Sequence, residues 1–204
     1  MATVTEASLA LWSSTATDLA IIEAVRNDVL YEVVDDKFRE LPPMGVEEGV
    51  LAATLFRLLS QFAWTAGVGR VVSEILFRLI PETKLQLRPD LALVSFDRWP
   101  RGRRIPKASA WDVVPNLAIE VVSPSHSAYE VLGKIEGYFR CGVERVWVIY
   151  PTVVKLYDYD SPVSVSILTH DQTLSGGAVL PGLYLPLAEL FENEDAGEDT
   201  LQMN

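Results

Sequence analysis

Cysteine, histidine and long apolar runs are all scarce in this sequence of 204 residues. The single cysteine, Cys141, excludes an internal disulfide and a zinc site built from cysteines. The only two histidines, His126 and His170, lack the spacing of a histidine-based zinc motif. No apolar run reaches the length of about eighteen residues that a membrane-spanning helix needs, so we expect no contact with a membrane.

Basic residues are also few, because 17 Lys and Arg stand against 28 Asp and Glu and leave a net charge of −11. The first basic residue is Arg26, so the positively charged start of a secretory signal peptide is missing. These features predict a soluble, cytoplasmic protein. Taken alone, the acidic balance argues against a protein that coats nucleic acid, because contacts to phosphates need Lys and Arg.

The remaining composition is that of a folded domain, with 49% hydrophobic and 22% charged residues. Such a chain can bury a sizeable core, which excludes disorder of the whole chain. We predict a loosely ordered segment over 1–17, a single domain over 18–191 and an acidic, disordered tail over 192–204. Six acids and no base follow residue 188, and without them the net charge would be −5.

One loop has the opposite charge. Five basic residues fall within ten positions: Arg98, Arg101, Arg103, Arg104 and Lys107. Two interpretations stand at about even odds, a solvated loop and a contact to a nucleic-acid backbone.

Hydrophobic periodicity and turn residues predict an ordered series of helices and strands. Helical spacing of apolar residues is strongest over 46–65, and a Ser127–Glu130 capping box predicts a helix that begins there. The other predicted elements are a helix over 19–27 capped by Asp18, hairpins over 31–41 and 153–169, strands over 70–80, 91–95, 117–122 and 146–150, and a short helix at the end of 180–191. Helices alternate with strands in the middle, so we predict an α/β or α+β fold: a mixed β-sheet flanked by helices, with extra β-hairpins.

Glu120 is the sharpest anomaly, because it lies inside the apolar strand over 117–122. Strand alternation puts Ala118 and Val122 on its own face and Ile119 and Val121 on the opposite one. A buried, unpaired carboxylate costs several kcal/mol, so Glu120 needs a cation nearby. That cation is either a Lys or Arg in a plain salt bridge or a divalent metal.

Asp90 stands at the entrance of the strand over 91–95. Its interpretation as a metal ligand is stronger when it is considered together with Glu120. Two carboxylates at the ends of neighbouring buried strands can converge on a hard cation, which is how Mg²⁺ is usually held. Glu47 and Glu48 begin the helix over 46–65, and one of them could tip towards this site. For Glu47 and for Glu48 individually, the better interpretation is a surface acid whose negative charge interacts favourably with the helix dipole.

Lys134 lies on the predicted helix that follows Glu120 and flanks its apolar stripe. Its ammonium could run along the apolar surface to Glu120. It then serves as a salt-bridge partner or, near a metal, as a charge that stabilises the transition state of phosphoryl transfer. His126 follows the same strand and is interpreted as a loop histidine, with contact to substrate as the alternative.

Three sequence segments together resemble the Uma2 family, which consists of restriction-endonuclease-like bacterial proteins of the PD-(D/E)XK nuclease superfamily. They are Arg88-Pro-Asp90, Asn116-Leu-Ala-Ile-Glu-Val-Val-Ser-Pro-Ser125 and the stretch from Lys134 to Val143 running into Trp147. The resemblance covers roughly residues 20 to 190 and includes Tyr31-Glu-Val-Val as the opening hairpin and Leu180-Pro-Gly-Leu as the closing segment.

The resemblance implies a restriction-endonuclease-like fold and a Mg²⁺- or Mn²⁺-dependent nuclease acting on nucleic acid, with DNA the expected substrate. It gives Asp90 and Glu120 the places of the two metal-binding acids, and Glu48 that of an acid from the first helix. The superfamily's lysine two residues after the second acid is Val122 here, and Lys134 on the next helix takes that catalytic role. A homodimer is expected by analogy with double-strand cutters. The alternative is a nuclease-like fold without catalysis that serves as a binding or regulatory module, favoured by the acidic balance and by Val122.

Overall fold

A computed structural model of the chain describes residues 15–34, 36–80, 85–124 and 126–191. The predicted acidic tail over 192–204 and most of the predicted N-terminal segment lie outside these residues. Within the described part, no helix combines the length and the apolar character needed to cross a membrane.

A mixed sheet of six strands forms the centre of the molecule, in the order β10-β9-β8-β7-β6-β3. Only the β7–β8 pair is parallel, and the other neighbours are antiparallel. The strands are β3 (Gly69–Ser73), β6 (Leu91–Ser95), β7 (Leu117–Val121), β8 (Arg145–Tyr150), β9 (Lys155–Ser161) and β10 (Ser164–Thr169), with a 3-10 turn over Pro151–Val153.

Two further sheets are antiparallel. The larger has four strands in the order β2-β1-β5-β4, made of β1 (Tyr31–Val34), β2 (Lys37–Glu40), β4 (Phe77–Ile80) and β5 (Leu85–Leu87). The smaller pairs β11 (Thr173–Ser175) with β12 (Tyr184–Pro186).

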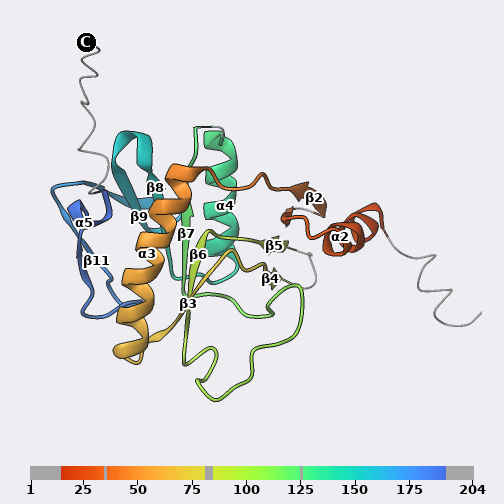
Figure 1. Ribbon diagram of the computed structural model, residues 1–204, viewed down its shortest axis with the longest axis horizontal. Helices are drawn as coiled ribbons and strands as arrows, with labels where there is room; N and C mark the ends of the chain where they lie inside the picture. The colour runs from red at the N-terminus through yellow and green to blue at the C-terminus, as the bar shows by residue number, and fades with distance from the viewer. Residues whose placement is uncertain (1–14, 35, 81–84, 125, 192–204) are drawn as a thin grey trace, which may run out of the picture.

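Helices cover both faces of the six-stranded sheet (Figure 1). On one face, α3 (Val46–Thr65) and α5 (Ala188–Phe191) pack with Ile119 and Trp147 in one apolar cluster. On the other, α4 (Ala128–Arg140) and the four-stranded sheet pack on Ala118 and Val148 in a second cluster. Helix α2 (Ala16–Arg26) lies beside β2 at one end of the molecule (Figure 1), where its Ala24 packs with Tyr31 and Val33 in a third apolar cluster. The predicted mixed sheet flanked by helices is therefore confirmed.

The strand predicted over 70–80 is wrong, because the chain changes sheets within it. Glu74 has a φ of 51°, in the left-handed region, which turns the backbone between β3 and β4. As a result β3 pairs with β6, whereas β4 pairs with β5. The short strands β5, β11 and β12 were not predicted, because three residues give too little alternation to detect.

Side-chain caps set the starts of two helices. Ser127 and Glu130 form the predicted capping box at the start of α4. The first helix begins at Ala16, earlier than predicted, because Thr15 is its N-cap. Asp18 is instead the third helical residue and closes a second capping box with Thr15.

Candidate functional site

The antiparallel pairing of β6 and β7 brings Asp90 and Glu120 together. Leu91 pairs with Ile119, so the next residues along the ladder, Asp90 and Glu120, come opposite each other. Opposite residues of an antiparallel pair project from the same face of the sheet. The Val121 N–H donates to Asp90 Oδ2 at 2.6 Å, which fixes the Asp90 carboxylate beside Glu120.

Both carboxylates line a cavity of about 270 Å³. Glu48, His126 and Lys134 line it as well, whereas Glu47, the other acid considered at the start of α3, does not. It lies where the ends of β6 and β7 meet the start of α3 and one side of α4. These elements are far apart in the sequence, and the register of the sheet brings them close together in space.

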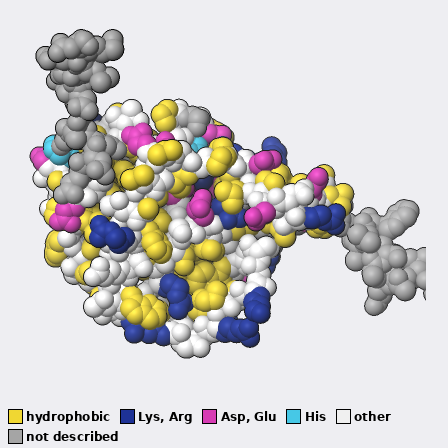
Figure 2. All heavy atoms as spheres, in the orientation of Figure 1, with side chains coloured by type: hydrophobic (Ala, Val, Ile, Leu, Met, Phe, Trp, Pro, Cys, Tyr) yellow, Lys and Arg dark blue, Asp and Glu magenta, His cyan; other side chains and the backbone are white. Residues whose placement is uncertain are grey.

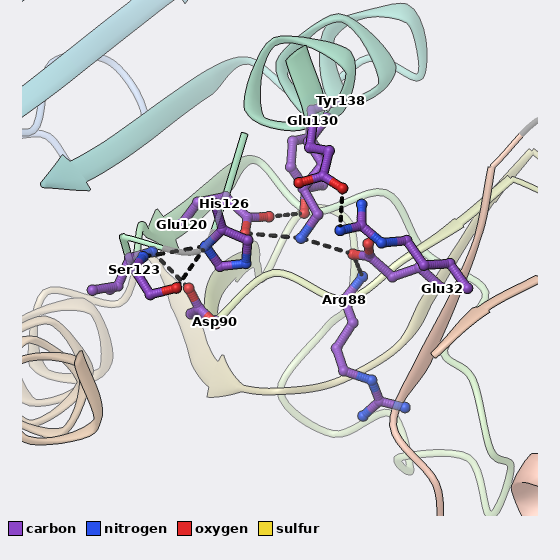
Figure 3. Close-up of polar contacts among 11 residues, drawn as sticks. Glu32, Arg88, Asp90, Glu120, Ser123, His126, Glu130 and Tyr138 are labelled. Atoms are coloured by element: carbon purple, nitrogen blue, oxygen red, sulfur yellow. Dashed lines mark hydrogen bonds and ion pairs between the residues drawn. The ribbon is translucent and has the colours of Figure 1, made fainter. Parts of the chain in front are cut away.

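Glu120 is buried with 7% of its surface exposed, and α4 supplies both of its partners. Lys134 Nζ lies 3.0 Å from Oε2, and the Tyr138 hydroxyl donates to Oε1 at 2.5 Å. Lys134 and Tyr138 are four residues apart and therefore share one face of the helix. This pairing offsets the cost of burying the carboxylate (Figure 3).

Glu32 is a member of the site that the sequence analysis missed. It comes from β1, is 0% exposed, and its Oε1 lies 3.0 Å from Lys134 Nζ. The main-chain N–H of Arg88 donates to Glu32 Oε1 at 2.8 Å. Among the described residues, Glu32 Oε2 is buried and has no hydrogen-bond partner. The available signal was an acid between Tyr31 and Val33. An acid on the solvent-facing side of a hairpin is common, so the sequence gives no reason to place Glu32 in a site. The fold, however, buries both sides of β1.

The site carries more negative than positive charge. Glu32, Asp90 and Glu120 share the one ammonium of Lys134. Burial, and then the negative charge of Glu120, raise the pKa of Asp90 to about 7. Burial also raises the pKa of Glu32, in spite of Lys134. Burial alone would lower the pKa of Lys134, but Glu120 and Glu32 raise it overall, so the ammonium stays protonated.

The donor set suits a hard divalent cation held by two protein carboxylates. Carboxylate oxygens are the ligands that Mg²⁺ and Mn²⁺ prefer, and Mg²⁺ usually keeps several waters beside one or two carboxylates. The strongly raised pKa of Asp90 marks negative charge that such a cation would offset. Asp90 and Glu120 therefore fit a metal site.

Glu48 lines the cavity, but its carboxylate bends back over the start of α3. A Cβ placed on Gly45, the N-cap residue, would lie 2.2 Å from Glu48 Oε2. Among the described residues, no three His, Cys, Asp or Glu side chains are grouped to hold a metal ion. The structure thus brings Glu48 to the cavity without joining its carboxylate to those of Asp90 and Glu120.

His126 lies in the same cavity, on the loop between β7 and α4 (Figure 3). The Ser123 N–H donates to His126 Nδ1 at 3.2 Å, which fixes the ring against this loop. Burial, followed by the charge of Lys134, lowers the pKa of His126. The imidazole is therefore neutral near pH 7, with its proton on Nε2.

The basic loop leaves from the opposite end of β6, because Asp90 precedes this strand and the loop follows it. Arg98 is structural: its guanidinium donates to the carbonyls of Val114 and Pro115 and pairs with Glu144 at 2.5 Å. Arg101 is exposed, and its Nη2 donates to the Trp64 carbonyl at the end of α3 at 2.6 Å.

Arg101 lies 4.5 Å from the ring centre of Trp64, and Arg103 lies 3.7 Å from that of Trp99. Figure 2 shows Lys and Arg side chains gathered around hydrophobic ones at the lower end of the molecule, where no Asp or Glu is visible. We name Trp64, Arg101, Arg103, Arg104 and Lys107 the basic surface. Of the five basic residues of the loop, Arg98 is half-buried, whereas the other four are exposed.

Comparison with solved structures supports the fold. A crystal structure described as a putative nuclease belonging to DUF820, from Anabaena variabilis, matches with a TM-score of 0.69 at 18% sequence identity. The match covers 79% of this chain and 89% of that one. No curated protein matches the sequence.

The sequence also matches a family, Uma2, described as "Putative restriction endonuclease", over residues 16–188. This range contains the paired strands, α3, α4 and every residue of the cavity. The chain therefore belongs to the Uma2 family.

Proposed function

We propose that the protein is a metal-dependent nuclease that hydrolyses phosphodiester bonds in nucleic acid, with DNA as its substrate. One observation carries the proposal: Asp90, directly before β6, and Glu120 of β7 line a single cavity, and the ammonium of Lys134 lies 3.0 Å from Glu120. Two carboxylates can hold a divalent cation that polarises a scissile phosphate, and a fixed ammonium beside them can stabilise the charge that develops in the transition state.

Asp90 and Glu120 are the proposed ligands of Mg²⁺ or Mn²⁺. Glu48 would be a third ligand only if its carboxylate turned away from the start of α3. When bound, the metal supplies positive charge to the scissile phosphate and lowers the pKa of water. Tyr138 holds Glu120 in place, and the Val121 N–H holds Asp90. The metal ligands are therefore positioned before the metal arrives.

Lys134 is the proposed catalytic cation. Its pKa is raised, so it remains an ammonium at every pH at which the enzyme would work. A fixed positive charge near the scissile phosphate stabilises the negative charge that develops in the transition state. Glu32 acts through Lys134 as a positioning residue, because it holds the other side of the ammonium at 3.0 Å.

The basic surface is the proposed contact to the nucleic-acid backbone. Glu48 and Trp64 lie in the first and last turns of α3, so about 24 Å of helix separates the cavity from this surface. That distance corresponds to about seven base pairs of B-form DNA. Arg101 and Arg103 would therefore bind phosphates to one side of the cleaved bond.

Nicking of supercoiled plasmid by purified protein tests the proposal, with Mg²⁺ or Mn²⁺ and with EDTA. Wild type should nick only with metal, and Glu120→Gln should lower the rate by at least 100-fold. Arg26→Gln, at an exposed position on α2, serves as a matched control and should retain full activity. Nicking that persists in Glu120→Gln or in EDTA would contradict the proposal.

A binding module without catalysis is the second candidate, and one observation favours it. Both oxygens of Glu120 already have partners within the chain, Lys134 and Tyr138. This candidate predicts that wild type binds duplex DNA but nicks no plasmid at any metal concentration. The nicking experiment therefore separates the two.

A further inference from the structure

His126 lines the same cavity as Asp90 and Glu120. It comes from the loop that joins β7, which carries Glu120, to α4, which carries Lys134. The side chain is half-buried, so it borders the cavity and keeps part of its surface accessible. A histidine in this position has three possible roles: to bind the metal, to act as a base, or to donate a hydrogen bond to the substrate.

The contacts of the ring decide between these three roles. His126 Nδ1 accepts from the main-chain N–H of Ser123 at 3.2 Å, and the Ser123 hydroxyl lies 3.3 Å from the same nitrogen. A ring nitrogen that accepts from an N–H carries no proton, so the neutral ring has its proton on Nε2. Nε2 then lacks the electron pair that binding a metal or removing a proton from water requires. The charged ring also has a proton on Nε2, so in either state Nε2 is a donor.

Nε2 of His126 is free to donate to a ligand. Among the described residues it has no hydrogen-bond partner, and it is not one of the buried side-chain atoms that lack one. It is therefore accessible. Figure 3 shows this nitrogen on the side of the ring that faces away from Ser123. A molecule in the cavity can accept from Nε2 without breaking a contact within the chain.

The ring lies close to the other positive group of the site. After burial, the charge of Lys134 has the largest effect on the pKa of His126 and lowers it. The cavity of about 270 Å³ thus has an ammonium and a ring N–H on its walls together with the proposed metal ligands. A phosphodiester offers acceptors for both, because its non-bridging oxygens carry the negative charge.

We propose that His126 is a substrate-binding residue whose Nε2–H donates to a phosphate oxygen of the nucleic acid in the metal cavity. This contact rests on the proposed function, since it needs a phosphodiester at the site. It gives His126 a role different from those of its neighbours: the metal and Lys134 supply charge, whereas the ring holds the substrate in place.

The ring also has a structural role, because Nδ1 and the main-chain N–H of His126 both contact Ser123. Two substitutions separate this role from substrate binding, because each retains a different end of the imidazole. His126→Asn keeps a polar atom at the position of Nδ1 and has none at that of Nε2, whereas His126→Gln does the reverse. Substrate binding through Nε2 predicts a loss in His126→Asn, and a purely structural role predicts the larger loss in His126→Gln.

Kinetics of plasmid nicking in Mg²⁺ are the first measurement. His126→Asn should raise KM about tenfold and leave kcat unchanged, because the contact to the phosphate is present before and during cleavage. His126→Gln should keep the KM of wild type. His170→Asn makes the same exchange at the only other histidine, which is exposed and lies outside the cavity, and should behave as wild type. An unchanged KM in His126→Asn, or an equal loss in His126→Gln, would overturn the proposal.

The ¹⁵N signals of the histidine rings provide a second measurement, which does not depend on cleavage. The sequence has 2 His residues, so His126→Asn identifies the signals of His126 by their loss. In the free protein, Nδ1 should have the shift of an unprotonated nitrogen and Nε2 that of a protonated one. A short DNA duplex should shift Nε2 of His126, and not the signals of His170, when Ca²⁺ is present, which takes oxygen ligands as Mg²⁺ does.

The two measurements distinguish this proposal from the proposed function. If wild type nicks no plasmid but the duplex shifts Nε2 of His126, the nuclease function fails and the contact to phosphate stands. If wild type nicks and His126→Asn nicks with the same KM, the nuclease function stands and the contact fails. A Nδ1 that carries the proton, or a Nε2 signal that the duplex leaves unmoved, would overturn the contact in either case.

Discussion

At the scale of single residues, the site depends on how three buried acids share one ammonium. Lys134 lies 3.0 Å from both Glu32 and Glu120, so it satisfies two carboxylates at once. Asp90 accepts from the Val121 N–H, and burial together with the charge of Glu120 raises its pKa to about 7. The lysine is thus required for stability as well as for the proposed chemistry.

Replacing Lys134 tests this requirement. Lys134→Met leaves Glu32 and Glu120 buried without a cation, which should lower the free energy of unfolding by about 3–5 kcal/mol at pH 8. The loss should be smaller at pH 5, because an unpaired buried carboxylate can take up a proton. Urea unfolding at both pH values measures it. The double variant Lys134→Met with Glu32→Gln should recover part of the loss, and equal losses at the two pH values would contradict the account.

Asp90 predicts a pH dependence of stability. Its pKa is about 7 in the folded protein and 3.8 ordinarily, so between these values the folded state holds a proton that the unfolded state has released. This contribution to stability is fully present below about pH 4 and is lost as the pH rises through 7. Asp90→Asn should therefore raise the free energy of unfolding by about 2–4 kcal/mol at pH 8 and by almost nothing at pH 4. Urea titrations in EDTA give both values, and a destabilised variant at pH 8 would refute the assignment.

At the scale of elements, strong local patterns made part of the structure predictable from the sequence. The apolar stripe of α3 and the Ser127–Glu130 capping box of α4 gave both helices. A carboxylate inside an apolar run marked Glu120, and the next helix marked Lys134 as its partner. These features depend on neighbours within about fifteen residues of the sequence.

The features that could not be predicted from the sequence depend on long-range packing. Glu32 reaches Lys134 only because β1 pairs with β5 and packs against α4. Tyr138 has the spacing of one more member of an apolar stripe, but in the fold its hydroxyl donates to Glu120. Two further features follow from tertiary structure that no local pattern encodes. One is the change of sheet at Glu74, and the other is the distance of the basic loop from the cavity.

The basic surface predicts a salt-dependent contact. Removing the charges of Arg101 and Arg103 together should reduce the slope of log K against log salt by about 1.8, the value for two phosphate contacts. Fluorescence anisotropy of a labelled duplex, in EDTA and at several salt concentrations, measures the slope. Arg26→Gln, on α2, shows the effect of removing one positive charge away from the basic surface. An unchanged slope in the double variant would show that DNA does not use this surface.

At the scale of the whole molecule, one sheet joins two separate surfaces. The candidate metal site lies at one end of β6 and β7, and the basic surface lies beyond the other end of β6. Net charge is −11, so the chain as a whole repels nucleic acid. Binding would therefore depend on the basic surface and on neutralisation of the acidic site by a cation.

Calorimetric titration of the protein with Mn²⁺, in two buffers of different ionisation enthalpy, tests the joint metal site of Asp90 and Glu120 most directly. Asp90 is mostly protonated at pH 6 because its pKa is about 7, so binding should release about one proton there and almost none at pH 8. Glu120→Gln and Asp90→Asn should each abolish the binding, while Arg26→Gln should retain it. Binding of Mn²⁺ that survives in Glu120→Gln, or no binding by wild type at either pH, would contradict the account.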